Sequence, residues 1–346
     1  MELVSTSNIH ATLLPGQLSV IQIPPAHIRS CTWPLLNLLL YGECGFRCRE
    51  DDDSNPPAEH ICRLQQSDLF SMVVDNDGIT LFLDPNGISM FEAANMQDKI
   101  VIAPQKWRAI QIHLGPMVAE FPGVVSFLSK LLAEDNISIL NMSTYDTDII
   151  YVQECNLESA VDCLQRKLSR GVHGLKEYKD QELQLSSEPN DLSCIVGSGQ
   201  YLAVYSACMV LVRLKKEALR DCAFGLTQLV LKSHSATKLT DSFWCYCETA
   251  EEISLILDEE CLTDFAEDAV IVSPDRWRVI KLCGKTYDFD ETGIVAAMSG
   301  LNSANTQVLN VSSFGSNVTL VLEDVLEESV ASLCSILNVS RVERIE

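Results

Sequence analysis

Trp107-Arg108-Ala109-Ile110 recurs 170 residues later as Trp277-Arg278-Val279-Ile280, and this repeat decides the fold. Each copy is followed by a short strand-like run, a loop, and a glycine that opens a helix-like stretch. The two glycines, Gly123 and Gly293, are again 170 residues apart. Because a duplication is the simplest cause of such self-similarity, we expect two similar halves.

The same order of elements follows both copies of the repeat. Apolar residues at intervals of three and four predict amphipathic helices at 124–132 and 294–301. Each helix precedes a predicted strand pair, at 137–143 with 147–152 and at 308–312 with 318–322, and then a second helix. With one further strand, this β-α-β-β-α order is the ferredoxin-like arrangement, an antiparallel sheet with both helices on one face.

A similar unit precedes each copy, because Ser71-Met72-Val73-Val74-Asp75 resembles Ser254-Leu255-Ile256-Leu257-Asp258. The predicted fold class is therefore α+β, with four tandem βαββα modules arranged as a duplicated pair. We expect a first module at 1–98 with an inserted loop at 43–65, and a second at 99–175. A polar linker at 176–200, a third module at 201–272 that begins with one strand at 201–211, and a fourth module at 273–346 complete the prediction.

The charge balance restricts the partners. The chain has 25 Lys and Arg against 48 Asp and Glu, a net charge of −23, so it offers no basic surface to nucleic acid or anionic membrane. No run approaches the ~20 apolar residues of a membrane span, and the first residues lack a signal-peptide pattern. We therefore expect a cytosolic protein whose 14 cysteines are reduced and mostly buried.

Patterns that would indicate catalysis are incomplete. Gly284-Lys285-Thr286 ends like a phosphate-binding loop, but Val279 stands where that motif needs its first glycine. No histidine stands beside a plausible nucleophile and base, so we expect no enzyme and no cofactor. A zinc site is a less favoured alternative to ordinary thiols, because the spacing is not that of a standard finger. Its ligands would be Cys44, Cys48, His60 and Cys62.

The glycine of the second half suggests a ligand site. Asp290 and Glu291 stand directly before Gly293-Ile294-Val295. The N–H groups of a helix start can hold a carboxylate, and nearby acids can accept from an ammonium, which together suit a free α-amino acid. The alternative is that the two acids only stabilise the helix start. Since the first half reads Glu120-Phe121-Pro122-Gly123 there, we expect one composite site rather than two.

These residues identify a resemblance to the CASTOR family of cytosolic amino-acid sensors, whose βαββα modules are ACT modules. The resemblance is carried by Met-Ser-Thr-Tyr-Asp-Thr-Asp at 142–148, Trp277-Arg278, and Phe-Asp-Glu-Thr-Gly-Ile-Val at 289–295. It implies a homodimer that binds a free amino acid, arginine above all, between the second and fourth modules. It also implies a ligand-controlled contact with the GATOR complex, which acts upstream of the TOR kinase.

The resemblance also implies roles for individual residues. The ligand-binding positions are Ser138, Ile139, Asp290, Glu291, Gly293, Ile294, Val295, Ser313, Phe314 and Asn317. The partner-binding positions are Tyr145, Asp146, Asp148 and Asp275, of which the first three lie on a turn expected to be exposed.

Two departures from the family pattern leave alternatives open. Asn317 falls where the family's arginine sensor has an aspartate for the guanidinium, and Asp146 replaces a glutamine. Hydrogen bonds to charged groups contribute roughly 1.5–3 kcal/mol, so an amide is expected to weaken arginine binding about 10–100-fold. The alternatives are a different ligand, or arginine binding offset by other nearby acids. A ligand-independent scaffold and a regulatory chain of an amino-acid metabolic enzyme also remain.

Overall fold

The computed structural model describes residues 9–40, 69–113, 123–174, 199–233, 243–301 and 307–345. The inserted loop at 43–65 and the linker up to residue 198 lie outside the described residues, as do Glu120-Phe121-Pro122. The less favoured alternative of a zinc site at Cys44, Cys48, His60 and Cys62 also falls outside the described residues.

The two halves repeat nearly the same elements. The first half contains β1 (His10–Leu13), β2 (Ser19–Ile23), α1 (Thr32–Leu40), β3 (Phe70–Asp75), β4 (Gly78–Leu83), α2 (Pro85–Ala93), β5 (Val101–Ile102), β6 (Trp107–His113), α3 (Val124–Glu134), β7 (Ile139–Ser143), β8 (Thr147–Gln153), α4 (Leu157–Lys167) and β9 (Val172–His173). The second half contains β10 (Tyr201–Tyr205), β11 (Met209–Leu214), α5 (Ala223–Lys232), β12 (Trp244–Glu248), β13 (Ile253–Asp258), β14 (Val270–Val272), β15 (Trp277–Cys283), α6 (Ile294–Ser299), β16 (Val308–Ser313), β17 (Ser316–Leu322), α7 (Leu326–Ile336) and β18 (Val342–Ile345). After β13 a 3-10 helix, Glu259–Asp264, takes the place of α2. Within these ranges, no helix is long and apolar enough to span a membrane.

Strand pairing follows the duplication. The first and third modules join through β3 and β12, which gives the order β5-β2-β4-β3-β12-β13-β11-β14. The second and fourth modules join through β7 and β16, which gives β9-β1-β6-β8-β7-β16-β17-β15-β10-β18. Each order is symmetrical about its seam, so the predicted α+β fold of four modules in a duplicated pair is confirmed.

The first strand of each half crosses the predicted module boundaries. β1 pairs with β6 and β9, and β10 pairs with β15 and β18. The sequence pattern predicted one strand at 201–211, but the chain breaks at 206–208 and continues into the other sheet as β11. Residues 10–13 and 201–205 therefore belong to the sheet of the second and fourth modules. There they cover the edges of β6 and β15, which would otherwise be unpaired. The remaining boundaries stay predictions.

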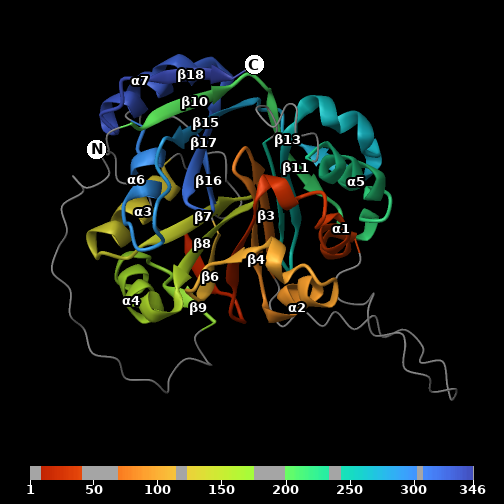
Figure 1. Ribbon diagram of the computed structural model, residues 1–346. Coiled ribbons are helices and arrows are strands. Elements are labelled where there is room, and N and C mark those ends of the chain that lie inside the picture. The colour runs from red at the N-terminus through yellow and green to blue at the C-terminus, as the bar shows by residue number, and fades with distance from the viewer. Residues whose placement is uncertain are drawn as a thin grey trace, which may run out of the picture.

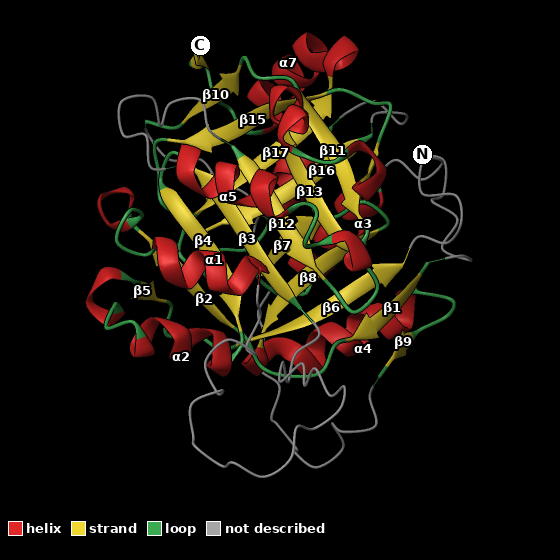
Figure 2. Ribbon diagram, turned by 90° about the vertical axis from the view of Figure 1, so that its right-hand side faces the viewer, coloured by secondary structure: helices red, strands yellow, loops and turns green. Residues whose placement is uncertain are grey.

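The two sheets pack face to face with helices on the outside. Figure 1 shows α1, α2 and α5 on one side of the strands and α3, α4 and α6 on the other, and Figure 2 looks onto α1 and α5. Alternation along β15 explains this layering. Trp277 and Val279 enter the buried cluster between the sheets, whereas Ile280 and Leu282 enter the cluster that also contains residues of α6 and α7.

Candidate functional site

The second and fourth modules meet along β7 and β16, where Met142 pairs with Val311. Each strand donates a backbone N–H to a serine of the other: Asn141 N to Ser312 Oγ at 2.9 Å, and Asn310 N to Ser143 Oγ at 3.0 Å. These bonds are equivalent under the duplication, since Asn310 lies 169 positions after Asn141 and Ser312 lies 169 positions after Ser143. The seam therefore has a local twofold relation.

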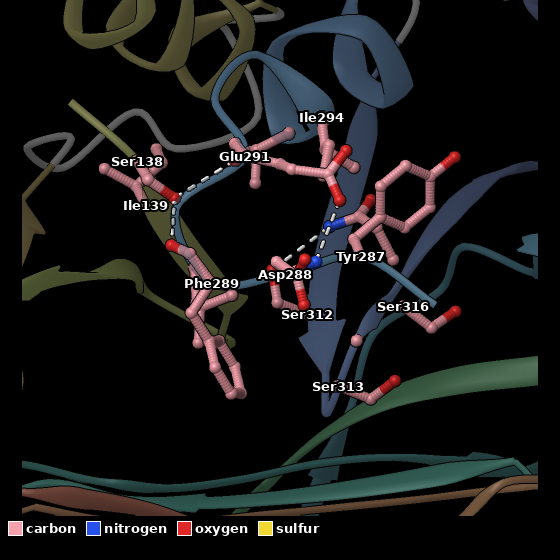
Figure 3. A pocket seen from close by; sticks show the side chains of 14 residues that line it. Ser138, Ile139, Tyr287, Asp288, Phe289, Glu291, Ile294, Ser312, Ser313 and Ser316 are labelled. Atoms are coloured by element: carbon pink, nitrogen blue, oxygen red, sulfur yellow. Dashed lines mark hydrogen bonds between the residues drawn. The ribbon is translucent and has the colours of Figure 1, made fainter. Parts of the chain in front are cut away.

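A pocket with walls from both modules lies beside this seam (Figure 3). It contains about 330 Å³ of space outside the protein atoms, part of it open to solvent. The lining residues are Ser138, Ile139, Leu140, Tyr287, Asp288, Phe289, Glu291, Ile294, Val295, Ser312, Ser313, Gly315, Ser316 and Asn317.

Seven of the ten predicted ligand positions line the pocket: Ser138, Ile139, Glu291, Ile294, Val295, Ser313 and Asn317. Of the other three, Asp290 is exposed and Phe314 packs edge-on against Phe289. Gly293 has φ 83°, and Gly123 has φ 88° in the other half. Both are left-handed, so each glycine is needed for the backbone at the start of its helix. Their roles in ligand binding stay predictions.

Seven lining residues were not predicted from the sequence: Leu140, Tyr287, Asp288, Phe289, Ser312, Gly315 and Ser316. Each is a chain neighbour, within a few positions, of a residue that was predicted. Tyr287 could have been found, because it lies on the same loop as the two acids; its hydroxyl accepts from the Gln200 side-chain amide. The two serines, Ser312 and Ser316, carry no pattern that distinguishes them from ordinary strand or turn residues.

The loop before α6 is attached to the second module. Ser138 Oγ donates to the carbonyl oxygens of Phe289 at 2.7 Å and Glu291 at 3.1 Å (Figure 3). Gln153 Nε2 donates to the same Phe289 oxygen at 2.8 Å, and the Phe289 ring packs edge-on against Trp107. Ser138 therefore ties the two modules together, and its single hydroxyl proton is already engaged.

The Glu291 carboxylate is engaged at both oxygens. Its Oε1 accepts from the Asp288 N–H at 2.9 Å, and its Oε2 forms an ion pair with the Lys285 ammonium. The Lys285 Nζ also lies 4.8 Å from the centre of the Tyr287 ring. Asp290 and Glu291 were expected to receive a ligand ammonium. Both oxygens of Glu291 already have partners within the protein, and Asp290 does not line the pocket. Asp288, at the exposed rim, is the other carboxylate of the lining.

Asn317 is only 1% exposed and pairs with Asn310. Asn310 Nδ2 donates to Asn317 Oδ1 at 2.7 Å, and Asn317 Nδ2 donates back to Asn310 Oδ1 at 3.1 Å. Asn317 Nδ2 also lies 3.1 Å from Ser312 Oγ. The amide oxygen that was expected to meet a ligand side chain is therefore already bonded within the protein.

Asp148 is the equivalent of Asn317 in the first half, 169 positions earlier. The expectation that it lies on an exposed turn is wrong, because strand alternation turns it into the seam, where Ser143 Oγ donates to its Oδ1 at 2.6 Å. Burial raises the pKa of Asp148 to about 6, although hydrogen bonds from Ser143 and Asn141 act to lower it. Tyr145, by contrast, is partly exposed.

The turn that carries Asp146 packs against the third module. Asp146 Oδ2 lies 2.7 Å from Arg213 NH1, and Thr144 Oγ1 donates to Glu252 Oε1 at 2.8 Å. Burial, opposed by the Thr144 hydrogen bond and assisted by the charge of Asp146, raises the pKa of Glu252 to about 7. Asp275 is partly exposed just before β15. Of the predicted partner surface, Tyr145, Asp146 and Asp275 thus reach solvent.

Metal chemistry has no support in the described part of the chain. Over those residues, no group of three His, Cys, Asp or Glu side chains is placed to hold a metal ion.

Both modules that meet at the seam match the same known domain family. The ACT domain model matches residues 102–166 and 272–335, which cover most of the second and fourth modules. The Mus musculus protein named "Cytosolic arginine sensor for mTORC1 subunit 1" is 24% identical over 345 residues, covering 90% of this chain and 92% of that protein. The Homo sapiens protein of that name is 25% identical over 281 residues, covering 76% and 84%. A crystal structure of aspartate kinase from Synechocystis aligns with 100% of this chain and 58% of its own at 12% identity and a TM-score of 0.34. The chain therefore contains two segments that match the ACT domain model, and over most of its length it is similar in sequence to proteins named as cytosolic arginine sensors for mTORC1.

Proposed function

We propose that the chain is a non-catalytic, cytosolic sensor of a free amino acid. The observation that carries the proposal is the pocket at the seam of the second and fourth modules, with lining residues from both halves. The similarity to proteins named as arginine sensors, over 90% of this chain for the mouse protein, supports the same conclusion.

A ligand at a seam can act as a signal. It shifts the balance between two arrangements of the modules only by its difference in affinity for them. The pocket wall already contacts the first module, since Ser313 Oγ donates to Asp75 Oδ2 at 2.9 Å and Phe314 N to Thr80 Oγ1 at 2.8 Å. A change in that wall on ligand binding would therefore reach the sheet of the first and third modules.

The proposed partner is a GATOR-type complex upstream of the TOR kinase, contacted by a homodimer of this chain. Tyr145, Asp146 and Asp275 supply the partner surface in this proposal. Asp148, which is buried, contributes only by holding the turn that carries the first two. The resemblance to the CASTOR family and the names of the similar proteins support the pathway, and the contact of this turn with the third module connects it to the rest of the molecule.

Thermal unfolding of the purified full chain with each amino acid in turn tests the sensor. A ligand at 100 times its Kd stabilises the folded state by about 2.7 kcal/mol. Ile139→Trp, which fills the pocket, should abolish the stabilisation. Ile271→Trp, at an exposed position of β14, should leave it intact. If no amino acid shifts the midpoint of the wild-type chain, the sensor proposal is wrong.

A further inference from the structure

Lys285 reaches the pocket wall from outside the lining. Lys285 does not line the pocket, but Glu291 does, and the Lys285 ammonium forms an ion pair with the Glu291 carboxylate. The face of the Tyr287 ring holds the same ammonium from a second direction. Lys285 therefore occupies the place at Glu291 that a cationic ligand group would need.

The charges around the pocket can be balanced against those of a ligand. The lining contains two acids, Asp288 and Glu291, and Lys285 neutralises the second. One carboxylate is left, at the exposed rim, and it can match the α-ammonium that every free amino acid carries. Arginine and lysine carry a second cation, for which no lining carboxylate remains. The net charge of −23 attracts cations to the whole protein but does not provide this local partner.

The buried polar side chains of the pocket lining, which are serines and Asn317, carry no charge. Ser313 Oγ donates to Asp75, Ser316 Oγ donates to the Leu282 carbonyl oxygen at 3.2 Å, and the amide of Asn317 is bonded to Asn310. A guanidinium brings five N–H donors and a charge, and burying it without a carboxylate is strongly unfavourable. The serine oxygens can still accept from a neutral hydroxyl or amide group.

From this charge balance we infer that the pocket takes an amino acid with an uncharged side chain, and that Lys285 determines this choice by neutralising Glu291. The inference rests on the proposed function, since it names the ligand class of the same pocket. Lys285 acts as a specificity-determining residue through Glu291, without touching the ligand.

Calorimetric titration of the full chain with arginine, lysine, leucine, threonine and glutamine tests the inference. In the wild type, at least one uncharged amino acid should bind about 10-fold or more tightly than arginine. Lys285→Met keeps the length of the side chain and frees the Glu291 carboxylate. It should raise arginine and lysine affinity about 10-fold, because charge-assisted hydrogen bonds are strong, and change affinity for the uncharged ligand by less than about 3-fold.

Lys99→Met is the matched control. The Lys99 side chain is 33% exposed, as is that of Lys285, and it pairs with Asp98 at 2.7 Å away from the pocket. This variant should not change any of the affinities, and Lys285→Gln provides a second test if the methionine variant unfolds. If arginine binds the wild type as tightly as the best uncharged ligand, the inference is wrong, but the proposal that the chain is an amino-acid sensor stands. Binding of no amino acid at all would overturn both.

Discussion

Asp148→Asn should stabilise the protein at neutral pH. The equivalent position of the second half already holds an asparagine, Asn317, whose Nδ2 donates to Asn310 Oδ1. In the first half the corresponding acceptor, Asn141 Oδ1, is buried and has no hydrogen-bond partner within the described residues, because a carboxylate has no donor to offer. The substitution would supply that donor and remove a buried charge, with almost no change in shape.

The magnitude follows from the pKa of Asp148, which burial raises from 3.8 to about 6. As the pH rises from 4 to 6, the unfolded chain releases this proton while the folded protein retains it, so wild-type stability falls over that interval. A difference of roughly 2 pKa units corresponds to about 3 kcal/mol at most. We therefore expect Asp148→Asn to be about 1–3 kcal/mol more stable than the wild type above pH 7. Near pH 4 the electrostatic part of this gain should vanish.

Urea unfolding of both chains between pH 4 and pH 8 measures this difference. Asp162→Asn, on the exposed surface of α4, is the control and should change the free energy of unfolding by less than about 0.5 kcal/mol at every pH. A variant no more stable than the wild type at pH 8, or a gain independent of pH, would refute the reasoning about the buried carboxylate.

Two further substitutions test the architecture. Lys281 is 2% exposed and pairs with Asp75 Oδ2 at 2.9 Å, so Lys281→Met should lower the free energy of unfolding by about 3–5 kcal/mol through the acid left unpaired. Denaturant unfolding measures this loss, and a neutral result would show that the pair contributes nothing. Gly293→Ala should lower the free energy of unfolding by about 1–2 kcal/mol because φ is 83° there. Thermal unfolding would contradict this if the variant melted at the wild-type temperature.

Much of the fold was predictable because the duplication preserves local patterns. The spacing of Val124, Leu128 and Leu131 predicted α3, and the two positive φ angles at Gly123 and Gly293 agree with the expected helix starts. The single strand predicted at 201–211 was wrong, because an apolar run does not reveal that it divides between two sheets.

The candidate site was predictable only as a region. Ser138 and Glu291 line one pocket, as the resemblance implied, although 153 positions separate them. Whether the polar atoms of the predicted residues are available to a ligand depends on neighbouring side chains that no sequence motif specifies. Lys285 on Glu291 and Asn310 on Asn317 are such neighbours.

The sequence by itself determined the repeat, the four modules and the acidic charge, because each depends on residue type and spacing along the chain. Only the tertiary structure decided which acids remain open to a ligand and that Asp148 is buried. Side-chain contacts beside the seam settle those questions, because strand pairing and loop geometry bring their partners together: Lys285 with Glu291, Asn310 with Asn317, and Ser143 with Asp148. The Trp-Arg repeat thus reveals the duplication, and packing beside the seam determines the chemistry of the pocket.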